Sequence, residues 1–286
     1  MVEAAAGAAR PVGGTVAILG LGLVGGSLAR DLHALGWRVL GHDRDAPTLD
    51  AAVREGCVRV ALGSDLAGIE DADLVVVAVP VGEVPRVLRD VALRPGASVV
   101  TDVASTKRSV LAAAEAAGLA PRFVGAHPLA GDHRSGWSAS RCGLFRGAAV
   151  FLCPARGAGP AVIQRAVALW RAVGAEPRVS DAAEHDRLMA WVSHLPQAAA
   201  SALALALARS GLAAKALGPG GRDTTRLAAS SPGVWTDILL DNADEVGAAL
   251  AALEASIAEL RRTLERGDRR TLAEALEAAR RWKEAT

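Results

Sequence analysis

Hydrophobic residues along the chain follow two patterns, and the change between them falls near residue 181. Between residues 15 and 180, short runs of Val, Ile and Leu alternate with alanine-rich stretches of helical character. The runs are apolar almost without interruption, as strands buried on both faces require, so the alternation predicts a parallel sheet with crossover helices. We expect strands at residues 15–20, 38–43, 74–80, 98–103, 123–128 and 148–154.

Strand signals stop after residue 181, and residues 181–211, 246–268 and 269–286 are helical by period and propensity. The pattern therefore predicts a flexible leader at residues 1–14, an α/β domain at 15–180 and an all-α domain at 181–286. One helix of the second domain carries an apolar stripe, which either packs within the chain or forms a dimer interface. The stripe consists of Leu250, Leu253, Ile257, Leu260 and Leu264.

The composition restricts the binding partners and the cellular compartment that we expect for this protein. The chain has 286 residues, of which 51 % are hydrophobic and 22 % charged, as expected for two compact domains. The formal net charge is +1 and the basic residues are scattered, so we expect neither nucleic acid nor a membrane as partner. Three cysteines without CxxC spacing, no signal peptide and no membrane-length apolar run predict a cytoplasmic protein without a metal site.

A glycine motif after the first expected strand predicts a dinucleotide site. In "VAILGLGLVGGSLARDL", Gly20, Gly22 and Gly25 stand in G-x-G-x-x-G register between a strand and a helix. The first glycine permits a tight turn, the second a close approach of the pyrophosphate, and the third close packing of helix and strand. The expected cofactor-binding residues are Gly20, Leu21, Gly22, Leu23, Val24, Gly25, Asp43, Arg44, Val79 and Pro80.

The acidic residue after the second strand points to NAD as the cofactor. Asp43 follows the motif by about twenty residues, where a carboxylate accepts hydrogen bonds from the adenosine ribose and repels a 2′-phosphate. Arg44 beside it leaves the preference over NADP open, because an arginine can pair with a phosphate. The whole arrangement is typical of a Rossmann-type α/β domain.

Two more strands carry polar residues to the same edge of the sheet. Residues 98–103 lead to Asp102 and Ser105, and residues 123–128 end in His127 and Pro128. A histidine there can take a proton from a hydroxyl as a hydride leaves the carbon, although a histidine bonded to backbone is the structural alternative. Ser105 or Thr106 is expected to cap the following helix, with a catalytic role for Ser105 as an addition.

The helical domain offers one histidine and two arginines as substrate contacts. His194 lies two residues before Pro196, which we expect to bend a helix and turn His194 toward the cleft. Arg222 and Arg226 follow a glycine-rich loop, and a guanidinium there suits a carboxylate, although a solvated arginine fits the sequence equally well.

Five segments together resemble the prephenate dehydrogenases of tyrosine biosynthesis. They are "GLGLVGGS", "DVASTK", "GAHPLAGDHRSG", "VSHLPQ" and "GRDTTRLAASSPGVW", and the likeness runs from Thr15 to about Asn242. The resemblance implies NAD-dependent oxidative decarboxylation of prephenate to 4-hydroxyphenylpyruvate. It also implies that His127 accepts the proton of the ring hydroxyl, with Ser105 bonded to the same hydroxyl or to the histidine. Arg226 would grip a substrate carboxylate, and His194 would line the pocket.

The resemblance is compatible with two substrates, prephenate and arogenate. Gln197 stands where many relatives have a second histidine, and His133 where some have glutamate. Arg134 and a charged His133 suit the keto acid prephenate, whereas Asp132 could hold the ammonium of arogenate. Prephenate is favoured. The helical domain resembles the family's dimerisation domain, which favours a homodimer.

Two rival functions use the same nucleotide domain. The β-hydroxyacid dehydrogenases need a lysine at the start of the helical domain, and residues 181–196 contain none. A redox sensor that binds NAD without catalysis would have no use for His127, Ser105, His194 and Arg226.

Overall fold

The computed structural model describes residues 13–96, 98–131 and 134–285. The predicted leader, except Gly13 and Gly14, therefore lies outside the described residues, as does His133. The described chain divides into two compact units. The first holds the chain up to Met189 together with Ala229–Asp241, and the second holds Ala190–Ala228 and Asn242–Thr286. The domain boundary at residue 181 stays a prediction.

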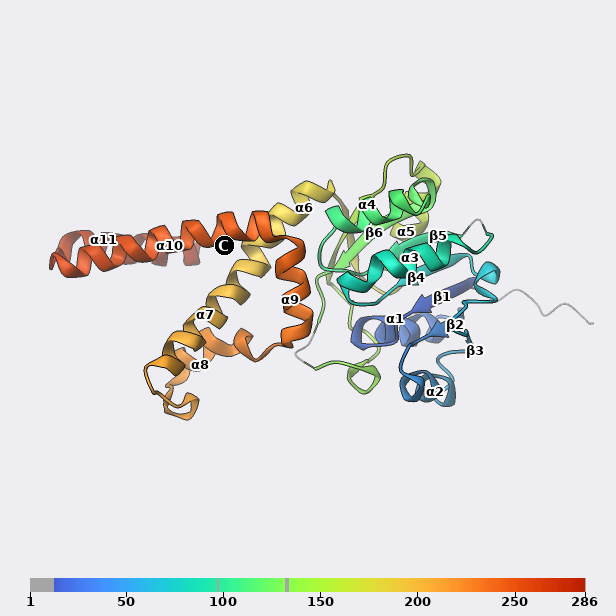
Figure 1. Ribbon diagram of the computed structural model, residues 1–286, viewed down its shortest axis with the longest axis horizontal. Coiled ribbons are helices and arrows are strands. Elements are labelled where there is room, and N and C mark those ends of the chain that lie inside the picture. The colour runs from blue at the N-terminus through green and yellow to red at the C-terminus, as the bar shows by residue number, and fades with distance from the viewer. Residues whose placement is uncertain (1–12, 97, 132–133, 286) are drawn as a thin grey trace, which may run out of the picture. The chain divides into compact units, whose positions relative to one another are not determined.

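An eight-stranded sheet forms the first unit, in the order β3-β2-β1-β4-β5-β6-β7-β8 (Figure 1). The predicted α/β class is confirmed, and the pairs from β3 to β6 are all parallel. The strands are β1 Thr15–Leu19, β2 Arg38–His42, β3 Val60–Ala61, β4 Leu74–Val77, β5 Val99–Asp102, β6 Phe123–Pro128, β7 Ala149–Pro154 and β8 Glu176–Val179.

The far edge of the sheet departs from the predicted parallel arrangement. Strand β7 runs antiparallel to β6, with His127 opposite Phe151, and β8 then pairs parallel with β7. Among its described residues the connection from β6 to β7 contains a short 3₁₀ turn, Trp137–Ala139, and no α-helix, whereas parallel neighbours are usually joined by a crossover helix. Strands β3 and β8, which the hydrophobic pattern did not predict, are short and largely exposed, so they lack the apolar run of a buried strand.

Helices cover both faces of the sheet, because alternate strand residues point to opposite sides. In β4, Leu74 and Val76 belong to the core beneath α1, α2 and α5. Val75 and Val77 belong to the core beneath α3 and α4. The helices of this unit are α1 Leu23–Ala34, α2 Ala46–Arg54, α3 Val84–Ala92, α4 Arg108–Ala116, α5 Pro160–Ala172, α6 Ala182–Met189 and α9 Pro232–Asp241.

The second unit is helical, as predicted. It consists of a π-helical turn at Ala190–His194 followed by α7 Leu195–Arg209, α8 Pro219–Thr225, α10 Ala243–Glu265 and α11 Arg269–Glu284. Within this unit α10 packs against the π turn, α7 and α11. Pro196 lies in the first turn of α7, which directly follows the helical residues 190–194. The irregularity expected near Pro196 is present as a π turn that ends at His194, directly before α7.

Part of the apolar stripe on α10 is exposed in the single chain. Ile257 is 56 % and Leu264 64 % exposed, so packing within the chain does not account for them. Within the described residues, no helix is both long and apolar enough to cross a membrane. The cytoplasmic location inferred from the cysteines stays a prediction.

Candidate active site

The glycine loop between β1 and α1 has a geometry that side chains would disturb. Gly20 has φ +101°, and a Cβ added to it would lie 2.3 Å from the carbonyl oxygen of Ala78. A Cβ on Gly25 would lie 2.0 Å from the carbonyl oxygen of Gly20, because α1 packs directly on the strand end. At Gly22, by contrast, no described atom lies within 4 Å of an added Cβ. The loop is therefore tightly packed at Gly20 and Gly25 and open at Gly22, as an approaching pyrophosphate requires.

The Asp43 carboxylate is fixed at the end of β2 beside this loop. Its two oxygens accept hydrogen bonds from the amides of Leu21 (2.7 Å) and Asp45 (2.9 Å). These bonds hold the carboxylate at the rim of a cavity of about 190 Å³. That cavity is lined by Gly20, Gly22, Asp43, Arg44, Val79 and Pro80 among others, so six of the predicted cofactor residues meet at one site.

A second cavity of about 350 Å³ adjoins the first, since Gly22, Val79 and Pro80 line both. It continues along the carboxyl ends of the strands to Ser105 and Arg134. The predicted residues Leu23 and Val24 also line it, together with Ser231, Val234 and Trp235 from the start of α9. The two cavities form a path from the Asp43 carboxylate to a mostly apolar pocket with a few polar groups such as Ser105 and Arg134, the layout that a dinucleotide and a small substrate need.

The buried Asp102 has a structural task. Its carboxylate forms an ion pair with the fully buried Lys107 and accepts the amides of Ala104 (2.8 Å) and Ala126 (3.0 Å). Lys107 Nζ also donates to the carbonyl oxygen of Ala126 (2.7 Å). The pair therefore ties the end of β5 to β6, one residue before His127.

The expected capping of α4 by Ser105 or Thr106 is wrong. The helix begins at Arg108 with Lys107 at its N-cap position, and the Thr106 hydroxyl donates to Asp241 (2.5 Å). The amides of Lys107 (2.8 Å) and Arg108 (2.9 Å) donate instead to the Asp186 carboxylate, which comes from α6. A carboxylate from a distant helix has thus replaced the local hydroxyl. Ser105 is left half-buried in the wall of the second cavity.

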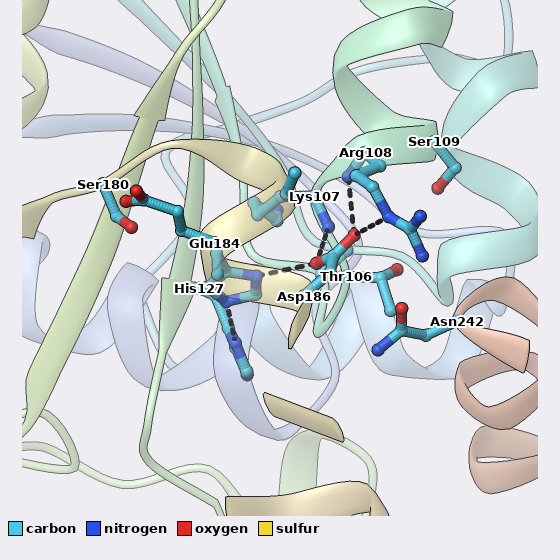
Figure 2. A network of polar contacts seen from close by, with 12 residues as sticks. Thr106, Lys107, Arg108, Ser109, His127, Ser180, Glu184, Asp186 and Asn242 are labelled. Atoms are coloured by element: carbon cyan, nitrogen blue, oxygen red, sulfur yellow. Dashed lines mark hydrogen bonds and ion pairs between the residues drawn. The ribbon is translucent and has the colours of Figure 1, made fainter. Parts of the chain in front are cut away.

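His127 is buried at the carboxyl end of β6 and contacts a second histidine (Figure 2). Its Nδ1 lies 2.9 Å from Nε2 of His185, and Nδ1 of His185 lies 2.7 Å from the Asp186 carboxylate. The ring of His127 is therefore bonded to another side chain, and its catalytic role stays a prediction.

The predicted substrate residues of the helical part belong to the second unit. There His194 ends the π turn, and its Nδ1 lies 3.2 Å from the side-chain nitrogen Nδ2 of Asn242. Arg226 is exposed at the start of a 3₁₀ turn, Arg226–Ala229, while Arg222 lies in α8 and donates to the carbonyl oxygen of Leu217 (2.6 Å). Gln197 is buried and donates to the carbonyl oxygen of Leu227 (2.9 Å).

His185 and Asp186 are the site residues that the sequence reasoning missed. One signal was present in the sequence, since His185 and the apolar Met189 are four residues apart on a predicted helix and so share a face, which the structure shows to be buried. A His-Asp pair on the buried face of a helix needs polar partners from elsewhere in the fold.

The burial and partners of Asp186 set its charge. Burial acts to raise the pKa of Asp186, but the hydrogen bonds from His185 and from the amides of Arg108 and Lys107 outweigh it. The pKa therefore lies below its usual value, and Asp186 is ionised at neutral pH.

Comparison with known proteins identifies the family. Residues 28–179 match the family described as "Prephenate dehydrogenase, nucleotide-binding domain", and residues 181–278 match "Prephenate dehydrogenase, dimerization domain". The chain belongs to the prephenate dehydrogenase family. It is 33 % identical over 243 residues to the prephenate dehydrogenase of Bacillus subtilis, a match that covers 81 % of this chain and 65 % of that protein. The chain therefore spans slightly less than two thirds of that relative.

Two solved structures of the family have the same fold as this chain. Prephenate dehydrogenase from Aquifex aeolicus, in complex with hydroxyphenyl propionate and NAD+, has a TM-score of 0.88 at 30 % identity, over 95 % of this chain and 97 % of that one. Arogenate dehydrogenase from Synechocystis has a TM-score of 0.82 at 26 % identity, over 94 % of this chain and 99 % of that one.

Two glycine substitutions test the packing of the nucleotide loop. Gly25→Ala forces a methyl group against the Gly20 carbonyl and is expected to lower the free energy of unfolding by about 1–3 kcal/mol. Gly22→Ala meets open space and should stay within about 0.5 kcal/mol of the parent protein. Urea unfolding of both variants measures the difference. Equal stability of the two would contradict the close packing of α1 on β1.

A further substitution tests the buried ion pair. Lys107→Met leaves the Asp102 carboxylate buried without its counter-charge and is expected to destabilise the protein by about 3–5 kcal/mol. Arg86→Met is the matched control, because Arg86 pairs with Glu83 and Asp90 at the surface, where a pair contributes about 0–1 kcal/mol. Urea unfolding that shows the same small loss for both would mean that Lys107 does not hold β5 and β6 together.

Proposed function

We propose that the protein catalyses the NAD-dependent oxidative decarboxylation of prephenate to 4-hydroxyphenylpyruvate, with His127 as the proton acceptor. The observation that carries this proposal is a buried histidine at the carboxyl end of β6, in a chain of the prephenate dehydrogenase family. A redox sensor needs no such group at the edge of the sheet where its nucleotide loop lies.

The nucleotide loop fits NAD. The open front of Gly22 leaves room for the pyrophosphate, and the first turn of α1 offers its free amides to the phosphate charge. Asp43 stands where the adenosine ribose hydroxyls would donate, and its charge disfavours a 2′-phosphate. When bound, NAD supplies the hydride acceptor of the reaction.

The proton of the substrate's ring hydroxyl goes to His127. Removal of this proton from the oxygen on C4 pushes electrons toward that carbon as the hydride leaves it. The bond from the ring to its carboxylate then breaks, carbon dioxide departs, and the electron pair of that bond completes an aromatic ring. The resulting phenolate oxygen takes a proton back. Because aromatisation drives the reaction, the protein mainly positions the substrate and moves one proton.

The other predicted residues hold the substrate in this proposal. Ser105, in the wall of the second cavity, donates to the hydroxyl or to the histidine, and Arg134 in the same wall faces the acidic side chain of the substrate. Arg226, assigned from the sequence to a substrate carboxylate, and His194, assigned to the substrate pocket, both belong to the second unit. His133, assigned to the same role from the sequence, lies outside the described residues.

Arogenate is the competing substrate, because the Synechocystis protein with the same fold is an arogenate dehydrogenase. The test is the rise in NADH absorbance when the protein and NAD meet prephenate in one cuvette and arogenate in another. Turnover of prephenate supports the proposal. Turnover of arogenate alone would show that arogenate, and not prephenate, is the substrate. No NADH formation with either compound would favour a redox sensor.

Substitution of the proposed base separates catalysis from binding. His127→Asn is expected to lower kcat by about 10²–10⁴-fold, because a general base contributes that much, while the Kd for NAD stays unchanged. Gly22→Ala should give the opposite pattern, with NAD bound about tenfold more weakly or worse. Steady-state kinetics and calorimetric titration with NAD measure both effects. Full turnover by His127→Asn would exclude it as the base.

We also propose that the protein is a homodimer held together through its second unit. The exposed side chains of Ile257 and Leu264 on α10 and the match to a dimerization domain support this proposal. The double variant Ile257→Asp with Leu264→Asp is expected to run as a monomer in size-exclusion chromatography with light scattering. Leu93→Asp is the control, since Leu93 is 81 % exposed in the first unit. A double variant that keeps the parent's mass would contradict the interface.

A further inference from the structure

We propose that His185 and Asp186 are positioning residues that fix the protonation of His127, so that its Nε2 is the basic nitrogen. The inference rests on the proposed function, because it assigns a task in the reaction to two residues that the substrate does not touch.

The three side chains form a continuous chain of hydrogen bonds inside the first unit. His127 Nδ1 lies 2.9 Å from His185 Nε2, and His185 Nδ1 lies 2.7 Å from the carboxylate of Asp186. His127 is 8 %, His185 0 % and Asp186 1 % exposed, so water does not compete for these bonds. The His127 and His185 rings are T-shaped, with centroids 5.1 Å apart, and the Phe151 ring makes a second T-shaped contact with His185, with centroids 5.4 Å apart.

The carboxylate sets the direction of every proton in this chain. An ionised carboxylate only accepts hydrogen bonds, so Asp186 accepts from the Nδ1–H of His185. The Nε2 of a neutral His185 then carries a lone pair and accepts from the Nδ1–H of His127. A neutral His127 with its proton on Nδ1 has Nε2 as its basic nitrogen. Asp186, which is linked to His127 through the ring of His185, therefore decides the tautomer of the proposed base.

The same arrangement stabilises the product of proton transfer. When Nε2 of His127 takes the substrate proton, the ring becomes positively charged and its Nδ1–H still donates to His185. The negative charge of Asp186 lies at the end of that chain, in an interior where charges are weakly screened. This is the task that the carboxylate performs for the histidine of a serine protease.

A purely structural role explains only half of these contacts. Asp186 also accepts the amides of Lys107 and Arg108 and the Nε of Arg108 (3.3 Å), so it anchors the start of α4 whatever His185 does (Figure 2). His185 takes no part in that anchoring. His185 has both ring nitrogens in hydrogen bonds, one to a carboxylate and one to the proposed base. This arrangement is explained by a relay, by which we mean the hydrogen bonds from Asp186 through His185 to His127.

Several other ionisable groups lie near the relay in the part of the chain that the structure describes. Lys107 is paired with Asp102, Arg108 pairs with Asp186, and Glu184 and Asp181 are exposed on and before α6. Burial raises the pKa of the Cys153 thiol on β7 to about 12, so this thiol stays neutral. Asp186 is therefore the carboxylate whose removal changes the charge at the end of the relay.

Two substitutions test the relay through the pH dependence of kcat/KM with prephenate. Asp186→Asn removes the charge that favours a protonated His127, so the acid limb of the profile is expected to move to lower pH and kcat to fall by about 10–100-fold or more. His185→Gln keeps Asp186 on the start of α4 but breaks the relay, and should lower kcat in the same way with unchanged folding. Glu184→Gln, one residue away and exposed, should match the parent protein.

The outcomes separate the relay from the proposed function. No turnover by the parent protein would contradict the proposed function and, with it, the relay. An active parent whose His185→Gln and Asp186→Asn variants keep its kcat and acid limb overturns the relay alone. A loss of kcat that only follows the loss of folded protein, measured by urea unfolding, with an unmoved acid limb, also overturns it.

Discussion

The buried carboxylate of Asp186 is the group on which the architecture of the site depends. It accepts two amides at the start of α4 and a ring nitrogen of His185, so one side chain joins α6, α4 and the histidine pair. A buried charge is costly unless it is fully hydrogen-bonded, and here the bonds outweigh the cost of burial and hold the pKa of Asp186 low. The negative charge near His127 is thus a consequence of how the helices are anchored.

A second buried charge supports the strands in the same way. Lys107 and Asp102 pair between β5 and β6, and both Asp102 and Lys107 contact the backbone of Ala126. Lys107 therefore contributes its side chain to one anchor and its amide to the other. Because His127 directly follows Ala126, the position of the proposed base along the sheet edge is set by this pair, while its protonation is set by Asp186. The nucleotide loop at Gly20–Gly25 lies along the same edge of strand ends.

Features encoded by neighbouring residues could be predicted from the sequence, and features that join distant segments could not. The glycine loop was predictable because tight turn, close approach and close packing each require glycine at a fixed spacing. The antiparallel β7 was not, because an apolar run does not state the direction of its partner strand. Ser105 and Thr106 have good capping side chains, but Asp186, about eighty residues further on, accepts the amides at the start of α4 instead. His185 was missed for the same reason, since its role appears only when the fold brings it beside His127 of β6 and Phe151 of β7. The substrate class was predicted from the resemblance of five motifs together to one family, because no single motif identifies a substrate.

The most direct test of the account is the protonation of the His127 ring. Long-range ¹H–¹⁵N spectra of the labelled protein distinguish the two nitrogens of each of its six histidines, with His127→Asn providing the assignment. If Asp186 and His185 fix its protonation, neutral His127 carries its proton on Nδ1 and has an unprotonated Nε2. A neutral His127 with its proton on Nε2 would contradict the account, because the nitrogen needed to accept the substrate proton would then already hold one.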